Sequence, residues 1–415
     1  MTTPVRVPFP VVDEVSRHCL QEEEPETVHI EVHLPGPVDQ SRLRKAFTEA
    51  LHRHPRILMR EARGPWYRRR YEWELTAEPD VEVVTFAPAG PRALQDARTR
   101  ALTQAPPLSM SPPIRLEVVD SVLFLTINHT ALDGPACLRI LATAAELYGG
   151  TDNSPAAPPT RPAASPHQAP DIPTTWSPPA RVAPGTPDPS PGNGMLVTEL
   201  SLPHRPKGSP YTVNDQLMVT TALTIAHWNR EHGARPRPLR ITMPVDDRPR
   251  DTTMPIGNGT RLVEVPFPPA ELDHPDMSDL LRRTAERTRA LKSLPRPQLG
   301  HGAALLTAPW APVAARAAVT RALRRTAAPW TSTTLLSNIG RIPYPLDFGE
   351  ETGRAHAVWF SAPARMPRGL TVTTASTAGR LHLALRWSRA LLSHGDGAHL
   401  RDLFEHYLHT TEVTA

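Results

Sequence analysis

Cysteine and lysine are scarce in this chain. Its 415 residues include only two cysteines, Cys19 and Cys137, which exclude a disulfide framework and a thiolate-rich zinc site. The only lysines are Lys45, Lys207 and Lys292, so arginine carries almost all of the positive charge. No apolar run approaches the length of a membrane span, and the N-terminus lacks the regions of a signal peptide. We therefore expect a cytoplasmic protein without a membrane span.

The charge and the histidines point to no particular partner. A formal net charge of +4 is small for a chain of this length. Arginines and aromatic residues alternate between residues 66 and 73, but no nucleic-acid-binding motif accompanies them. We interpret them as the second strand of a hairpin with a solvated arginine face, and we expect no nucleic-acid partner. His29, His33, His52 and His54 satisfy no ligand spacing, and three of them lie on or near expected solvent-facing positions, so we expect no metal site.

Proline divides the chain. Prolines recur every few residues from 151 to 193, among alanine, threonine, serine and glycine, a composition that buries no core. We expect an extended linker there. It would join a first lobe, residues 1–150, to a second lobe, residues 194–415, across a cleft.

Both lobes show strands mixed with amphipathic helices. Residues 28–34 alternate, with Val28, Ile30 and Val32 on one side and histidines and Glu31 on the other, which predicts a half-buried strand. A helix at 312–326 carries several arginines, compatible with a membrane surface or an acidic carrier protein, although a solvated face is the plainer interpretation. The other predicted helices are 40–54, 93–102, 136–148, 212–228, 276–291 and 396–408. The other predicted strands are 57–63, 114–119, 122–127, 196–202, 239–244, 334–340, 369–374 and 381–387.

The chemistry centres on the turn between the strand at 122–127 and the helix at 136–148. Asn128, His129, Asp133 and Gly134 lie in this turn, and the start of a helix directs a partial positive charge towards it. A histidine can take a proton at neutral pH, so His129 is a candidate general base. No serine or cysteine nucleophile is obvious beside it, since Cys137 falls inside the helix. Asp133 could orient the imidazole, but it more naturally fixes the turn by pairing with a distant arginine.

These residues resemble the motif His-His-x-x-x-Asp-Gly of one acyltransferase superfamily. It comprises chloramphenicol acetyltransferase, nonribosomal peptide condensation domains, and polyketide-associated and wax-ester acyltransferases. Further similar segments occur in the family's order over nearly the whole chain: the Asp39-initiated helix with His54-Pro55, 212–215, 245–250 before Gly257-Asn258, 337–340 and 347–349.

The resemblance implies an α/β fold of two chloramphenicol-acetyltransferase-like lobes with mixed sheets in a V, and a tunnel between them. His129 would be the general base, Asp133 would pair with Arg248, and the N–H of Gly134 would help to hold an oxyanion. Ser337 and Asn338 would be polar donors from the opposite lobe. The acyl donor would be acyl-CoA or a phosphopantetheine thioester on an acyl or peptidyl carrier protein. The acceptor would be a small alcohol or amine, and no cofactor would be bound permanently.

One position departs from the family motif. Asn128 replaces its first histidine, and this position is a supporting one in many members. We therefore expect a stand-alone acyltransferase of natural-product or lipid biosynthesis that forms an ester or an amide. Two alternatives stay open: a related enzyme that cyclises or rearranges its substrate, and a non-catalytic module that recruits a carrier protein.

Overall fold

The computed structural model describes residues 5–151, 177–249, 254–273, 276–294, 299 and 303–412. In chain order the elements are β1 (Arg6–Pro8), α1 (Val11–His18), β2 (Thr27–His33), α2 (Gln40–Arg53), β3 (Met59–Glu61), β4 (Glu72–Leu75), β5 (Val84–Phe86), α3 (Ala93–Thr103), β6 (Ile114–Val119), β7 (Val122–Asn128), α4 (Gly134–Gly149), β8 (Asn193–Ser201), α5 (Val213–Glu231), β9 (Leu239–Val245), β10 (Arg261–Phe267), α6 (Pro269–Leu272), α7 (Met277–Ser293), α8 (Ala303–Thr307), α9 (Val313–Thr326), η1 (Ala328–Trp330), β11 (Thr334–Arg341), β12 (Ala357–Ser361), β13 (Leu370–Thr377), β14 (Arg380–Ser388) and α10 (His394–Thr410).

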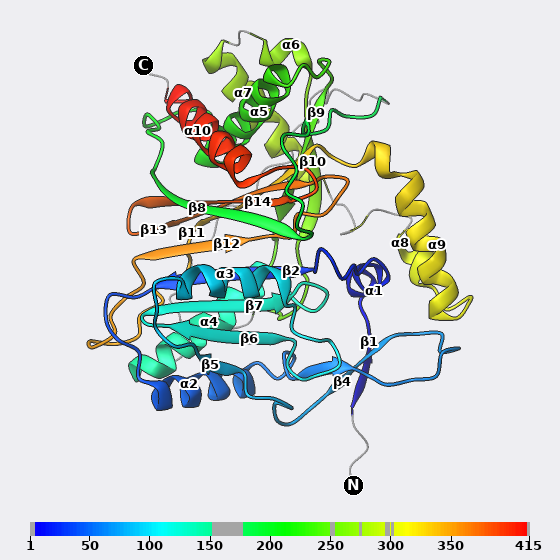
Figure 1. Cartoon of the computed structure of the whole chain (residues 1–415), viewed down its shortest axis with the longest axis vertical. Helices are drawn as coiled ribbons and strands as arrows, with labels where there is room; N and C mark the ends of the chain where they lie inside the picture. Colours follow the sequence, from blue (N-terminus) through cyan, green and yellow to red (C-terminus); the bar gives the residue numbers. More distant parts are fainter. Residues whose placement is uncertain are drawn as a thin grey trace.

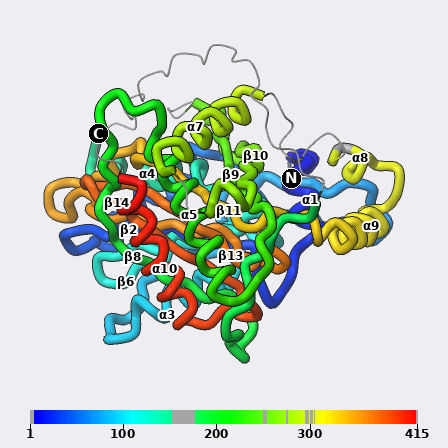
Figure 2. The backbone as a smooth tube through the Cα atoms, turned by 90° about the horizontal axis from the view of Figure 1, so that it is seen from above, coloured from blue at the N-terminus to red at the C-terminus, as the bar shows by residue number. Residues whose placement is uncertain are grey.

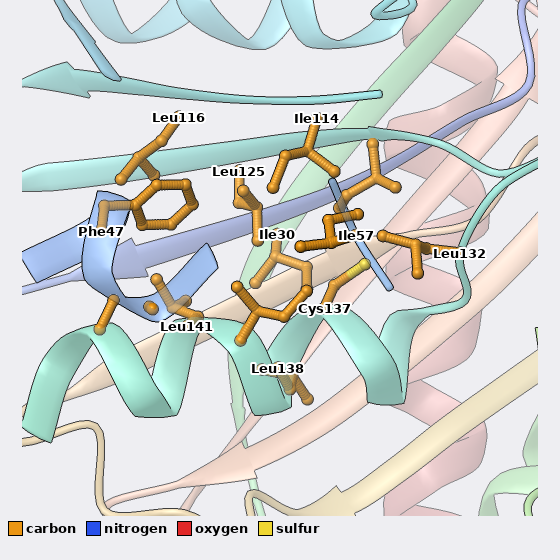
Figure 3. Packing of buried hydrophobic residues seen from close by; sticks show 14 of the residues in the cluster. Ile30, Phe47, Ile57, Ile114, Leu116, Leu125, Leu132, Cys137, Leu138 and Leu141 are labelled. Carbon is orange, nitrogen blue, oxygen red and sulfur yellow. The ribbon is translucent and has the colours of Figure 1, made fainter. Parts of the chain in front are cut away.

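The first lobe is built on a sheet of order β12-β2-β7-β6-β5. Its neighbours are antiparallel, except that β5 runs parallel to β6. Helices α2 and α4 pack on one face of this sheet, and α3 lies on the other (Figure 1). Figure 3 shows the core under the first face, where side chains of the strands meet Cys137 and Leu141 of α4. Cys137 is buried in this core and belongs to its packing, as expected for a free cysteine in a helix.

The second lobe is built on a sheet of order β10-β9-β11-β13-β14-β8. It is mixed, because β11 is parallel to both β9 and β13 while the other pairs are antiparallel. Helices α5, α7 and α10 cover its outer face, as the view from above shows (Figure 2). The inner face is turned towards the first lobe. Helices α8 and α9 project at one edge of the molecule, beside α1 (Figures 1 and 2).

Strand β12 joins the two lobes. It comes late in the chain but pairs antiparallel with β2 of the first sheet, from Ala357 opposite His33 to Ser361 opposite His29. Its Trp359 also donates from Nε1 to the carbonyl of Thr198 in β8, at 2.9 Å. The lobe boundaries at residues 150 and 194 stay predictions, but the first sheet is completed by a strand from beyond residue 350.

The predicted linker falls partly outside the described residues, which omit 152–176. Residues 177–192 are described and form no helix or strand. Within them Ala180, Val182 and Ala183 are buried in the core of the second lobe. This part of the segment therefore packs against a lobe, contrary to a composition that seemed unable to bury anything.

Helix caps explain why several predicted elements begin where they do. The Asp39 side chain accepts from the N–H of Arg42 at 2.7 Å, which starts α2. Thr212 and Asp215 form a capping box at the start of α5, and Asp276 caps α7. The elements without a prediction are β1, α1, β5, β10, α6, α8, η1 and β12. Helix α1 carries three valines at helical spacing, but its fully buried side chains are the polar ones, Asp13, Glu14 and His18.

Strand β2 is not half-buried, so that part of the prediction is wrong. His29 and Glu31 are fully buried on the side expected to face solvent. Arg98 of α3 covers this side and donates to Glu31 at 2.9 and 2.7 Å. A charged partner from another helix therefore allowed polar residues to sit on an inner face.

Two arginine-rich segments also differ from prediction. Residues 65–70 are irregular, and the second strand of that hairpin begins only at Glu72. In α9, Arg316 is fully buried and forms an ion pair with Glu14 of α1, so this helix is not solvated all round. Among the described residues, no helix is long and apolar enough to cross a membrane. The same part of the chain contains no cluster of three or more His, Cys, Asp or Glu side chains suited to a metal ion.

Buried histidines predict the acid sensitivity of the fold. Burial lowers the pKa of His29 and of His54 from 6.5 to about 4. Between these values the unfolded chain binds protons that the native protein does not, so the free energy of unfolding falls as pH drops from 6.5 towards 4. Asp13 acts oppositely, because burial raises its pKa to about 6 and the native state then binds the extra proton.

We expect His54→Gln to reduce the slope of the unfolding free energy against pH between pH 6.5 and 4.5. The reduction corresponds to up to about one proton taken up on unfolding. Urea denaturation at several pH values measures it. The comparison variant is His52→Gln, at a more exposed position two residues earlier on α2, which leaves the burial of His54 unchanged. An unchanged slope for His54→Gln would show that His54 does not titrate differently on folding.

Candidate active site

The end of β7 and the capped start of α4 determine the turn between them. Strand β7 ends at Asn128, and α4 begins at Gly134, with Pro135 in its first turn. The Asp133 side chain caps the helix by accepting from the N–H of Ala136 at 3.1 Å. His129 is thereby held in the connection between a buried strand and the positive end of a helix.

The His129 side chain is fixed in one tautomer. Its backbone N–H donates to the carbonyl of Glu26 at 2.7 Å, and its Nδ1 lies 2.8 Å from the carbonyl oxygen of Leu132. A carbonyl oxygen only accepts, so Nδ1 carries the proton and Nε2 keeps a lone pair. The imidazole is therefore oriented by a main-chain carbonyl rather than by a carboxylate.

Asp133 is bound to the second lobe instead of to His129. Nη2 of Arg248 lies 2.8 and 2.7 Å from its two carboxylate oxygens, which is the predicted pairing. The N–H groups of Gly259 and Thr260 donate to Oδ2 of Asp133 at 2.8 and 3.2 Å. Asp133 and Arg248 are both largely withdrawn from solvent. The carboxylate is thus fully occupied in holding the turn against the segment after β9; Arg250 of that segment lies outside the described residues.

Asn258 and α1 fasten the same turn, and sequence reasoning assigned neither a role in the site. Nδ2 of Asn258 lies 3.2 and 3.0 Å from the carbonyl oxygens of His129 and Thr130, and 3.0 Å from Oδ1 of Asp13. Ser16 of α1 bonds to the Thr130 hydroxyl at 3.2 Å. In the sequence, Asn258 stands out only through the family resemblance, and α1 is too short to indicate that it contacts the turn.

Asn128 is turned away from the cavity and into the protein. It is buried, its Nδ2 donates to the carbonyl of Pro106 at 3.0 Å, and its Oδ1 accepts from the N–H of Thr130 at 3.1 Å. An amide supplies a donor and an acceptor on one short side chain. In this position Asn128 stabilises the turn and does not reach a substrate.

A cavity of about 410 Å³ lies between the lobes and contains the predicted centre. The first lobe contributes His129, Asp133 and Gly134 to its wall, and the second contributes Ser337 and Asn338. Apolar side chains such as Val28, Leu138, Met254, Leu262, Leu335 and Phe360 line much of the remainder. A largely apolar cavity with a few convergent polar groups is typical of a small-molecule site.

The two polar residues of β11 differ in availability. Oδ1 of Asn338 accepts from the N–H of Gly340 and from the Thr374 hydroxyl, and its Nδ2 donates to Asn214 at 3.3 Å. The Ser337 hydroxyl makes no hydrogen bond with the described residues, and neither does the N–H of Gly134. Ser337 and Gly134 therefore have free donors at the wall, whereas Asn338 holds the irregular end of its strand.

Arg386 braces the loop that supports His129. This β14 residue is completely buried, donating to the Thr27 carbonyl at 2.7 Å, the Thr27 hydroxyl at 3.0 Å and Asn193 Oδ1 at 2.7 Å. Burial lowers the pKa of Arg386 to about 9, so it remains charged at neutral pH. It fixes the backbone next to Glu26, whose carbonyl binds the His129 N–H. In sequence it was only the polar member of an alternating strand.

Loss of Arg248 should destabilise the whole protein. Arg248→Met leaves the Asp133 charge buried without its partner, which costs about 3–5 kcal/mol of unfolding free energy. Urea denaturation measures the loss. The double variant with Asp133→Asn should recover part of it, because the stranded charge is then gone.

The matched control is Arg282→Met in α7, where the arginine pairs with exposed carboxylates. It should leave the denaturation midpoint almost unchanged. Equal midpoints for Arg248→Met and Arg282→Met would contradict a stabilising role for the buried pair.

Comparisons with known proteins agree with this geometry. The chain is 29% identical over 382 residues to the uncharacterized protein Rv2305 of Mycobacterium tuberculosis, covering 82% of this chain and 84% of that protein. The uncharacterized protein MT2362 of another strain matches equally. A scan against models of protein families finds no match.

Solved structures of the same architecture cover almost the whole chain. The condensation domain of the monacolin K polyketide synthase MokA superposes with a TM-score of 0.65 at 12% identity, over 98% of this chain and 97% of that one. The trichothecene 15-O-acetyltransferase TRI3 of Fusarium sporotrichioides gives 0.63 at 11% identity, over 99% and 96%. A mutant starter condensation domain of rhizomide synthetase RzmA, in complex with C8-CoA, gives 0.62 at 14% identity, over 97% and 94%. The chain therefore has the two-lobed α/β fold of condensation domains and chloramphenicol-acetyltransferase-like acyltransferases.

Proposed function

We propose that this protein is an acyltransferase that moves an acyl group from a thioester to an alcohol or an amine, with His129 as general base. The observation that carries the proposal is the free Nε2 of His129 on the wall of the cavity between the lobes. The likeness to condensation domains and to an acetyltransferase supports this reaction class. One of these neighbours holds C8-CoA, which favours an acyl-CoA or a related phosphopantetheine thioester as donor.

The transfer would proceed without an acyl-enzyme. Nε2 of His129 takes the proton of the acceptor's hydroxyl or amine while the acceptor's oxygen or nitrogen attacks the thioester carbonyl. The tetrahedral intermediate collapses by breaking the carbon–sulfur bond, and the imidazolium returns the proton to the leaving thiolate. Cys137 is no alternative nucleophile, because burial raises the pKa of its thiol well above the ordinary value.

The negative oxygen of the intermediate needs donors. The N–H of Gly134 at the start of α4 and the hydroxyl of Ser337 across the cavity are the available ones. Asp133 and Arg248 act through the turn, and Asn128 supports it from behind. The product is an ester if the acceptor that binds in the cavity is an alcohol, and an amide if it is an amine.

Replacing His129 tests the base directly. We expect His129→Ala to lower kcat by on the order of 10²–10⁴-fold while the melting temperature stays within a few degrees of wild type. Mass spectrometry of products from a panel of acyl-CoA thioesters and amine or alcohol acceptors gives the rate. His52→Ala on α2 is the control histidine and should retain full turnover. Wild-type turnover by His129→Ala would remove the general-base role.

A further inference from the structure

One part of the cavity wall carries several positive side chains. Arg324 comes from α9, and Arg365 and Arg368 come from the loop between β12 and β13; all three line the cavity. Glu26 lines the same cavity and forms an ion pair with Arg365. Arg365 also donates to the carbonyl of Cys19 at 2.7 Å, so its role is to join the two lobes.

The other carboxylates of the wall are already neutralised. Asp133 and Asp246 both bind Arg248, the latter at 2.8 Å from Nε. No carboxylate among the described residues forms an ion pair with Arg324 or Arg368. The wall therefore holds two guanidinium groups that no carboxylate of the described residues contacts in an ion pair, and Glu264 and Glu26 act on Arg368 only from a greater distance.

Arg368 shows this imbalance most clearly. It donates only to hydroxyls, from Nη2 to Ser332 at 2.9 Å and to Thr242 at 3.4 Å, and from Nε to Ser332 at 3.2 Å. Burial lowers its pKa to about 10, which still leaves it charged at neutral pH. The nearby carboxylate of Glu264 lies 3.3 Å from Nη1 of Arg240. The remaining nitrogen of Arg368, Nη1, makes no hydrogen bond with the described residues.

We infer that Arg324 and Arg368 form a subsite for a phosphate- or carboxylate-type anion on one of the two substrates. The inference rests on the proposed acyl transfer only in taking this cavity as the substrate site. A guanidinium withdrawn from water is stabilised by an anion, and its planar donors suit the paired oxygens of such a group. The hydroxyls of Ser332 and Thr242 hold the Arg368 fork in place without competing for its charge.

Two substrates could supply the anion. A CoA or phosphopantetheine thioester carries phosphates at the end remote from its sulfur, and an acceptor could carry an acid group of its own. Inorganic phosphate is a probe of the shared chemistry. Competition with CoA then identifies the source.

The test is phosphate binding to the full-length protein, measured by isothermal titration calorimetry. We expect Arg368→Gln and Arg324→Gln each to weaken phosphate binding by about tenfold or more, as for loss of a charge-assisted hydrogen bond. Arg325→Gln, with the same charge change at the adjacent exposed position of α9, should bind as wild type does. Circular dichroism melts confirm that the variants are folded, and the half-exposed Arg324 provides a test should Arg368→Gln unfold.

The outcomes separate the sources and the two proposals. If CoA displaces phosphate and pantetheine does not, the subsite receives the phosphates of the donor. If phosphate still binds with CoA saturating, and still depends on Arg368, the acceptor supplies the anion. Equal phosphate affinity in wild type, Arg324→Gln and Arg368→Gln would overturn the subsite. His129→Ala should bind phosphate normally, so loss of the general-base role and loss of the anion subsite would be seen independently.

Discussion

Asp133 of the first lobe and Arg248 of the second share a buried ion pair, and Asp133 also accepts from two main-chain N–H groups of the second lobe. This contact fixes the position of the turn that carries His129 relative to the second lobe on the other side of the cavity. The desolvation of two charges is offset here only because nearly every carboxylate lone pair is used. The position of the His129 imidazole thus depends on a residue 115 positions further along the chain than Asp133.

Because Asp133 is committed to the lobe interface, the imidazole takes its orientation from the carbonyl of Leu132. The main chain of the turn therefore does what a carboxylate does in a serine hydrolase triad: it sets the tautomer. The other side of the turn is fastened by Asn128, Asn258 and α1. Together these contacts hold the His129 side chain in one position at the cavity wall, which the proposed proton transfer requires.

The second lobe contributes positively charged side chains to the lobe interface and to the cavity wall. Arg365 and Arg386 reach from the second lobe to the segment before β2, and their partners are a carboxylate and main-chain carbonyls. Arg324 and Arg368 have no such partners among the described residues. The arginine-rich composition is thus divided between groups that join the lobes and groups that face the cavity.

Much of the local structure follows from sequence alone. The strand-turn-helix around His129, the caps at Asp39 and Thr212, and the hairpin of β13 and β14 are set by alternation, capping residues and turn glycines, all of which act over a few residues. The family resemblance predicted the fold class and the Asp133–Arg248 pairing. Helix α1 and strand β12 were not predicted, because α1 is short and buries polar side chains, and β12 completes a sheet whose other strands lie far away in the chain.

The tertiary structure decided what each polar residue does. Sequence determined that His129 and Asp133 share a turn, and the resemblance predicted that Asp133 pairs with Arg248, but only the packing showed that the imidazole is oriented by the carbonyl of Leu132. Sequence placed His29 and Glu31 on the polar side of a strand, and Arg98 from another helix made that side an interior. Local propensity is encoded by near neighbours, whereas the partner of a buried charge is chosen by whichever distant segments the fold brings to it.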